Sequence, residues 1–300
     1  MAYPATARIF EVGARDGLQN EKMQVPAPVK VDLIERLADA GVTAIEAGSF
    51  VSPKWVPQMA DTADVMARIT RKAGVSYAAL TPNLRGYEGA VAAHADEILI
   101  FSAASEMFNQ KNINCSIAES LERFAPVVAA AKKDGIPFKA SVSCALGSPF
   151  DEEITPAMVA DVSKKLYDMG AYEISIADTI GVGTPVKTRQ VLEAVADAIP
   201  LDAIGVHFHD TYGQALANIH VALQMGINKI DSSVAGLGGC PYAPGATGNV
   251  ATEDVVYMLD GMGIDSGIDL KKMVETAWFI SDYLGRAPVS SVAKAMKDKI

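Results

Sequence analysis

The 300-residue sequence has few cysteines, fewer basic than acidic residues and no long apolar run. Its three cysteines are widely spaced and odd in number, which favours free thiols in a reducing compartment over a disulfide framework. The net charge of −10 argues against a nucleic acid partner, because phosphate binding requires clustered lysine and arginine. No stretch of about 18 residues is free of charges and turn signals, so no transmembrane segment is expected.

The N-terminus also lacks the basic and apolar blocks of a signal peptide, and the final residues, KDKI, match no peroxisomal signal. These features predict a cytoplasmic protein. What the chain does contain is ordinary for a globular protein, with 50% hydrophobic and 21% charged residues. A chain of this length and composition can bury a sizeable core.

Short β-rich apolar runs alternate with longer segments of helical period along the whole sequence. Most of the runs are apolar on both faces, which is typical of strands in a sheet that is covered on both sides. Thr155-Pro156 and Thr184-Pro185 fit an N-cap followed by proline at the first helical position. The predicted strands lie in residues 8–14, 42–50, 75–82, 97–104, 137–145, 172–179, 203–210 and 227–235.

Eight such units without an intervening linker predict a (β/α)8 TIM barrel, an α/β fold. A doubly wound open sheet is the alternative, although it usually needs fewer units. The barrel is expected over about residues 8–263, with a C-terminal helical extension over about 264–300. Residues 1–300 are therefore expected to form a single domain.

Catalytic groups of a TIM barrel gather at the C-terminal ends of its strands, so polar residues at these ends are candidates for a site. His207 and His209 close the seventh run, and their spacing places both side chains on one face of a strand. Two converging imidazoles can chelate a metal ion; the alternative is a pair of histidines hydrogen-bonded for structure. His94 and His220 lie in helical patterns and are expected at the surface or in packing.

Other strand ends carry charged groups in otherwise apolar surroundings. Asp16 is a natural third ligand beside two histidines, and Arg15 could hold an oxyanion or a carboxylate. For this dipeptide the alternative is an exposed salt bridge in a turn. Glu46 and Asp178 stand in apolar runs, and a buried carboxylate needs a partner, for which Arg15 or a metal-bound group is expected. Asn249 follows the last run and completes a ring of polar groups.

Residues 236–250, GLGGCPYAPGATGNV, contain five glycines around a single cysteine, Cys240. Because so many glycines lose entropy on ordering and pack few side chains, a buried packing cysteine is a poor explanation. A thiol with an ordinary pKa of about 8.5 is a suitable acid, and glycine hinges would let it close over a bound substrate. Cys240 is therefore a candidate catalytic thiol.

Several motifs resemble those of the 3-hydroxy-3-methylglutaryl-CoA (HMG-CoA) lyase family. This family belongs to a superfamily of barrel metallolyases with Arg-Asp on the first strand and Glu on the second. The resemblance spans about residues 8–285, and the cysteine loop is its most specific part. The motifs are EVGARDGLQNEK (11–22), SFVSPKWVPQMAD (49–61), DTIGVGTP (178–185), HFHDTYGQALAN (207–218) and GLGGCPYAPGATGNVATEDVVYML (236–259).

The resemblance implies individual roles for the candidate residues. It implies that Arg15 stabilises the enolate of the product with support from Glu46, and that Asp178 lies near the metal and the substrate. Lys22 matches a lysine associated with the CoA end. The implied cofactor is a divalent metal, Mg²⁺ or Mn²⁺, bound by Asp16, His207, His209 and Asn249. The implied catalytic residues are Arg15, Asp16, Glu46, Asp178, His207 and Cys240.

Two positions of the glycine loop depart from the family pattern. Pro244 and Thr247 stand where the family often has lysine and serine, so the loop lacks that basic contact, although no proposed ligand is affected.

The implied reaction cleaves HMG-CoA to acetyl-CoA and acetoacetate, a reverse Claisen reaction of leucine degradation and ketone-body metabolism. A base takes the proton of the tertiary alcohol, which a metal polarises, and a thiol protonates the enolate. One alternative is a lyase for a longer branched 3-hydroxyglutaryl-CoA. Another is a condensing synthase of the isopropylmalate or homocitrate type, although 300 residues leave little room for the accessory region that such enzymes usually carry.

A barrel retained only as a binding protein would lack part of the polar ring, which is complete in this sequence. The expected partner is a small acyl-CoA substrate, with no nucleic acid and no membrane, and the chain is expected to form a homo-oligomer.

Overall fold

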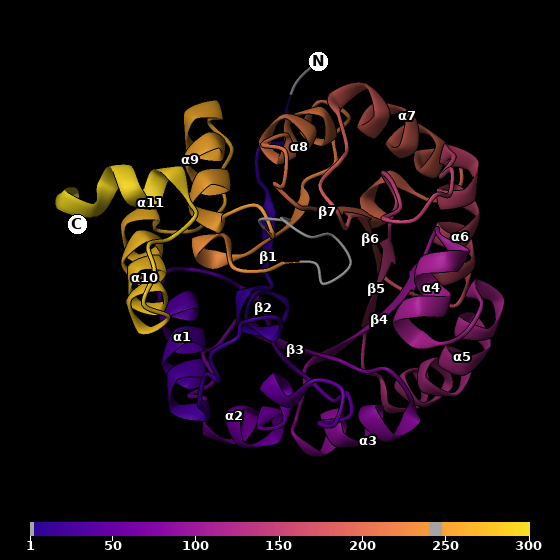
Figure 1. Ribbon diagram of the computed structural model, residues 1–300, viewed down its shortest axis with the longest axis horizontal. Helices are drawn as coiled ribbons and strands as arrows, with labels where there is room; N and C mark the ends of the chain where they lie inside the picture. The colour runs from indigo at the N-terminus through magenta and orange to yellow at the C-terminus, as the bar shows by residue number, and fades with distance from the viewer. Residues whose placement is uncertain (1–2, 240–247) are drawn as a thin grey trace.

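The computed structural model describes residues 3–239 and 248–300, which form a closed barrel of parallel strands. Each strand pairs with the next along the chain, and β8 pairs with β1 to close the barrel (Figure 1). The TIM-barrel prediction is confirmed, and the open doubly wound sheet is excluded. The strands are β1 (Arg8–Glu11), β2 (Ala44–Ser49), β3 (Ser76–Leu80), β4 (Glu97–Ala103), β5 (Phe138–Ser143), β6 (Glu173–Asp178), β7 (Ile204–Phe208) and β8 (Lys229–Ser232).

Helices surround the barrel, and α10 packs beside α1 and α9 on its outer side (Figure 1). No helix in the described residues is both long and apolar enough to cross a membrane. The α-helices are α1 (Ala27–Asp39), α2 (Thr62–Arg68), α3 (Leu84–Ala92), α4 (Glu106–Ile113), α5 (Ile117–Asp134), α6 (Pro156–Asp168), α7 (Pro185–Ala196), α8 (Ala215–Gln224), α9 (Thr252–Met262), α10 (Leu270–Tyr283) and α11 (Ser291–Met296).

Local sequence signals determine several helix ends. The hydroxyl of Thr155 accepts a hydrogen bond from the backbone N–H of Met158, so it caps α6 as predicted. Thr184 also precedes a helix that begins with proline, but its side chain makes no capping hydrogen bond. Helix α5 begins with a capping box between Ser116 and Glu119. The residue that follows its last turn, Gly135, has a φ of 70°, a conformation that favours glycine.

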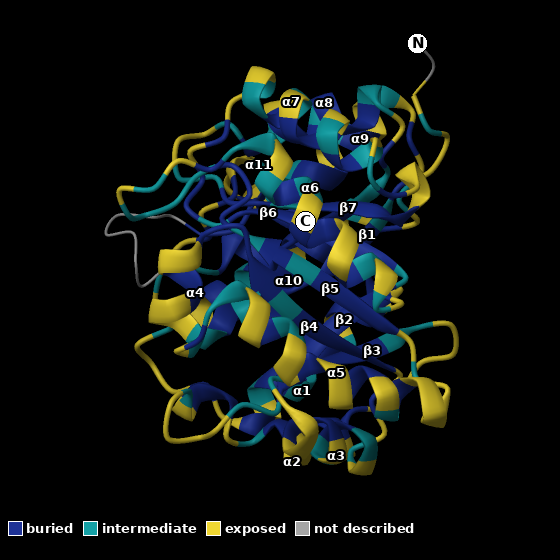
Figure 2. Ribbon diagram, turned by 90° about the vertical axis from the view of Figure 1, so that its right-hand side faces the viewer, coloured by how far each residue is buried: buried dark blue, intermediate teal, exposed yellow. Residues whose placement is uncertain are grey.

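The barrel contains a small apolar cluster and an ionic cluster, while the outward faces of the helices are exposed (Figure 2). The apolar cluster includes Phe10 and Leu99. In the ionic cluster, the Lys139 ammonium of β5 lies 2.7 Å from a Glu173 oxygen and 2.5 Å from an Asp231 oxygen. These side chains point inward because successive residues of a strand alternate between its faces.

Candidate active site

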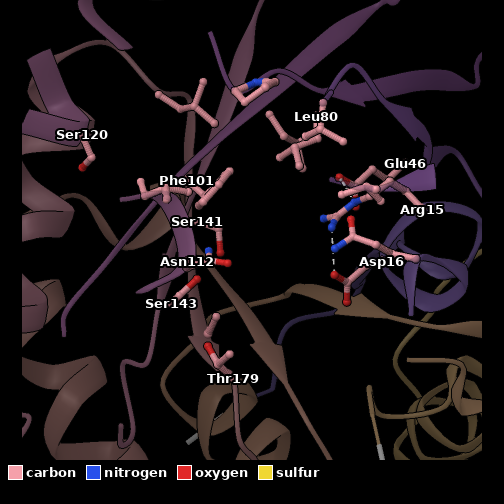
Figure 3. Close-up of a pocket in the computed structure, with 18 of the residues that line it drawn as sticks. Arg15, Asp16, Glu46, Leu80, Phe101, Asn112, Ser120, Ser141, Ser143 and Thr179 are labelled. Carbon is pink, nitrogen blue, oxygen red and sulfur yellow. Dashed lines mark hydrogen bonds and ion pairs between the residues drawn. The ribbon is translucent and has the colours of Figure 1, made fainter. Parts of the chain in front are cut away.

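The C-terminal ends of the strands surround a pocket of about 900 Å³. Arg15, Asp16 and Glu46 lie close together on one side, whereas Asn112 and Ser141 lie on the opposite side (Figure 3). The first side carries an arginine and two carboxylates, whereas the opposite side carries amide and hydroxyl groups together with the basic residues Lys111 and Arg123. This is the end of the barrel at which the sequence predicts the site.

Arg15 and Asp16 lie on a π-helical turn, Gly13–Gly17, that directly follows β1. The Arg15 Nη1 atom is 2.9 Å from Asp16 Oδ1, so the two neighbouring side chains form an ion pair. At Gly13 a Cβ atom would lie 2.6 Å from Glu11 Oε1, which explains why glycine occupies this position. The turn thus directs two consecutive charged side chains toward the pocket.

Glu46 of β2 is fully buried and holds the other edge of the Arg15 guanidinium, with 2.6 Å between Glu46 Oε1 and Arg15 Nε. Burial raises the pKa of Glu46 to about 6, although Arg15 opposes the shift. Burial also raises the pKa of Asp16, but Arg15, His207 and His209 outweigh it and lower that pKa to about 2. Asp16 is therefore a stable carboxylate at neutral pH.

His207 and His209 converge as their spacing predicts. Their ring centroids are 5.4 Å apart, and one ligand atom from each of them and from Asp16 all lie within 4.8 Å of one another. Burial and the neighbouring His207 lower the pKa of His209 to about 4, so this imidazole is neutral at pH 7. Its Nδ1 atom is buried and has no hydrogen-bond partner among the described residues. A neutral imidazole with an unused nitrogen suits a metal ligand.

Asn249 joins this cluster from the segment after the glycine loop. Its Nδ2 group donates to Asp16 Oδ2 over 2.8 Å and to the carbonyl oxygen of Leu237 over 3.2 Å. It also forms an isolated backbone bridge with His209. A carboxylate, two imidazoles and an amide form a mixed oxygen and nitrogen donor set that fits a divalent cation, so the residues present match the predicted cofactor.

Asp178 is buried at the end of β6, but its contacts differ from the predicted ones. Its two carboxylate oxygens accept hydrogen bonds from the backbone N–H groups of Val182 and Gly183, over 3.1 and 2.8 Å. Burial raises its pKa to about 6. Its neighbours Ala177 and Thr179 line the pocket, whereas Asp178 itself does not. The partners of this carboxylate are therefore the backbone of the following loop and not Arg15.

Lys22 is exposed and does not line the pocket. Cys240, together with Pro244 and Thr247 of the same loop, lies outside the described residues. The described residue just before the cysteine, Gly239, lines the pocket, and its carbonyl oxygen accepts a 3.0 Å hydrogen bond from Asn20.

The structure adds pocket residues that the sequence analysis did not select. Lys139 of β5 and Asp231 of β8 line the inner end of the pocket beneath His207. Both are charged residues in apolar runs, which is the signal that identified Glu46. Applied to every run, the same criterion would have found them.

Known proteins resemble this chain over most of its length. The family model described as HMGL-like matches residues 6–280. The chain is 59% identical to "Hydroxymethylglutaryl-CoA lyase, mitochondrial" of Gallus gallus, over 98% of this chain and 99% of the relative. It is 57% identical to "3-hydroxy-3-methylglutaryl-CoA lyase, cytoplasmic" of Mus musculus, over 97% of this chain and 85% of the relative.

Solved structures are similar over the same length. The crystal structure of hydroxymethylglutaryl-CoA lyase from Pseudomonas aeruginosa has a TM-score of 0.98 at 52% identity, over 100% of both chains. An HMG-CoA lyase from Acinetobacter baumannii in complex with coenzyme A and 3-methylmalate has a TM-score of 0.93 at 36% identity, over 98% of this chain and 96% of that one. The family match and these near full-length similarities show that the chain belongs to the HMGL-like family.

Proposed function

We propose that this protein is a metal-dependent carbon–carbon lyase that cleaves HMG-CoA to acetyl-CoA and acetoacetate. The observation that carries the proposal is the convergence of Asp16, His207 and His209 beside the Arg15 guanidinium, in a chain whose close relatives have this name. The C2–C3 bond breaks, the C3 hydroxyl loses its proton to become a ketone, and C2 gains a proton. The reaction therefore balances without a further reactant.

Asp16, His207, His209 and Asn249 would hold the divalent cation, which we propose to be Mg²⁺ or Mn²⁺. When bound, this cation supplies Lewis-acid polarisation of the C3 hydroxyl. Asp16 and His207 both line this side of the pocket, and we assign the removal of the hydroxyl proton to the Asp16 carboxylate.

Arg15 stabilises the thioester enolate that forms when the C2–C3 bond breaks. Its guanidinium is held by Glu46 on one edge and by Asp16 on another, so it is oriented before the substrate binds. Donors that are fixed before the charge develops need little reorganisation during the reaction. Cys240 then protonates C2. Asp178 supports the reaction through the loop that its carboxylate holds.

We also propose that the substrate enters as an acyl-CoA, in line with the coenzyme A bound to the Acinetobacter relative. Lys22 would contact the CoA end. A second candidate substrate is a longer branched 3-hydroxyglutaryl-CoA, which is favoured by the apolar side chains of Leu80, Leu99 and Phe101 along the pocket.

For the cellular setting, we propose a cytoplasmic homo-oligomer that acts in leucine degradation and ketone-body metabolism, and a single domain over residues 1–300. The name of the Mus musculus relative supports this location, whereas the Gallus gallus relative is named mitochondrial. Light scattering of the purified protein measures the oligomeric state.

The function is tested with purified protein and Mg²⁺ against a panel of CoA esters: HMG-CoA, analogues with longer 3-alkyl groups, and 3-hydroxybutyryl-CoA. We expect the highest kcat/KM for HMG-CoA or for a longer branched homologue, with equal amounts of acetyl-CoA and 3-oxoacid. Release of free CoA without acetyl-CoA would show a thioesterase and would contradict the proposal.

A further inference from the structure

His207 lies between two carboxylates that belong to opposite ends of the pocket. Its Nε2 atom is 3.9 Å from Asp16 Oδ2, at the proposed cation site. Its Nδ1 atom is 3.4 Å from Asp231 Oδ2, on the inner side of the barrel. The two ring nitrogens therefore face two different groups.

Asp231 is itself held from two sides. Lys139 Nζ lies 2.5 Å from Oδ1, and the Ser175 hydroxyl donates to Oδ2 over 2.7 Å. Only 5% of the Asp231 side chain is exposed. Because Lys139 is a donor without any acceptor, it requires an acceptor from Asp231. The carboxylate is thus charged, buried and fixed in place below the imidazole.

A carboxylate beside Nδ1 favours the tautomer that carries its proton on Nδ1, and leaves the Nε2 lone pair for a cation. We propose that Asp231 is a positioning residue, which sets the tautomer and orientation of His207 so that Nε2 can bind the metal. This inference rests on the proposed metal-dependent function. His209 has no such partner at Nδ1 among the described residues, so the effect of Asp231 is confined to His207.

The decisive variant is Asp231→Asn. Its amide oxygen would face Lys139, because the amide NH₂ group and the ammonium are both donors. The NH₂ group would then face His207 Nδ1, which would have to accept, and the imidazole proton would move to Nε2 at the cation site. Removal of such a supporting partner typically weakens metal binding 10- to 100-fold.

The matched control is Glu173→Gln. Glu173 is the other buried carboxylate beside Lys139, at 2.7 Å, and no contact joins it to His207 in the described structure. Binding of Mn²⁺ alone is measured by electron paramagnetic resonance, with thermal melting of each variant. We expect 10- to 100-fold weaker Mn²⁺ binding in Asp231→Asn, and binding within about threefold of wild type in Glu173→Gln.

Equal Mn²⁺ affinity in Asp231→Asn and wild type would overturn the inference, as would equal losses in both variants.

Absence of Mn²⁺ binding by the wild type would instead contradict the proposed function. If Asp231→Asn does not fold, the tautomer of neutral His207 in metal-free wild type decides the question by ¹⁵N NMR of labelled histidine. We expect the proton on Nδ1, and a proton on Nε2 would overturn the inference.

Discussion

At the scale of single residues, the Arg15 side chain is held by two carboxylates, with Glu46 Oε1 2.6 Å from its Nε and Asp16 Oδ1 2.9 Å from its Nη1. Arg15→Lys keeps the charge but loses the planar fork that meets both carboxylates. We expect kcat to fall about 10²-fold or more, with a much smaller change in KM, because the lost interaction forms with the developing enolate. Steady-state kinetics on HMG-CoA measures both constants.

The matched control is Arg8→Lys. Arg8 begins the same strand and pairs with Glu173 at 3.3 Å, but it lies at the opposite end of the barrel. The kcat of Arg8→Lys is expected to stay within a few-fold of the wild-type value. A large rise in KM at unchanged kcat in Arg15→Lys would assign Arg15 to ordinary substrate binding.

Cys240 has a separate prediction. If its thiol protonates the enolate, Cys240→Ser should lower kcat by about 10² or more, because a hydroxyl is a far weaker acid. Alkylating reagents should modify Cys240 before Cys115 and Cys144, which are both buried. Burial also raises the pKa of the Cys115 thiol and so lowers its reactivity. Mass spectrometry during inactivation identifies the site, and a fully active serine variant would contradict the assignment.

At the scale of elements, Glu11 connects the turn that follows β1 to the turn that follows β8. One of its oxygens accepts hydrogen bonds from the backbone N–H groups of Gly13, over 2.8 Å, and of Val234, over 2.9 Å. The other contacts the hydroxyl of Thr252. This single side chain thus ties the π-helical turn after β1 to the segment after β8.

Burial raises the pKa of Glu11 from 4.5 to about 7. A raised pKa in the folded state contributes stability at pH below 4.5, and this contribution is lost as pH rises to about 7. Glu11→Gln keeps the acceptor and can donate to Thr252 without ionising. Its thermal stability relative to wild type should therefore increase from pH 5 to pH 8, by on the order of 3 kcal/mol at most.

Thermal melts at both pH values, with the exposed-carboxylate variant Glu88→Gln as control, test this expectation. A difference between wild type and Glu11→Gln that does not change with pH would contradict it.

At the scale of the whole molecule, the barrel core does not include the cation site. Chelation should therefore abolish turnover and leave the circular dichroism spectrum of the folded protein unchanged. Mn²⁺ at 100 times its dissociation constant should add about 2.7 kcal/mol to the stability, because it binds only the folded state. Unfolding at room temperature after chelation, or full activity of the metal-free protein, would contradict the account.

The barrel and the histidine pair were predictable because the local residue pattern indicates where strands and helices alternate and which side chains of a strand share a face. His207 and His209 share a face through their spacing alone, and the eighth strand pairs with the first as closure requires. The hydrogen-bond partners of Asp178 were not predictable in this way. The carboxylate accepts from backbone N–H groups of a loop, and the residue types of a loop do not specify its backbone geometry.

The contacts of Asp231 were not predictable from the sequence either, because they join residues far apart along the chain. The residues that fix it, Lys139 and Ser175, lie 92 and 56 positions away in sequence. Their proximity follows only from the strand register inside the closed barrel.

The most direct test of the central claim is one NMR time course in ²H₂O, with HMG-CoA, Mg²⁺ and the purified protein. The account predicts acetoacetate and acetyl-CoA in equal amounts, with a single deuterium on the acetyl methyl group, because C2 receives one exchangeable proton after the C2–C3 bond breaks. It also predicts no products once the cation is chelated. Free CoA with intact 3-hydroxy-3-methylglutarate, or cleavage that continues unchanged in the presence of chelator, would contradict it.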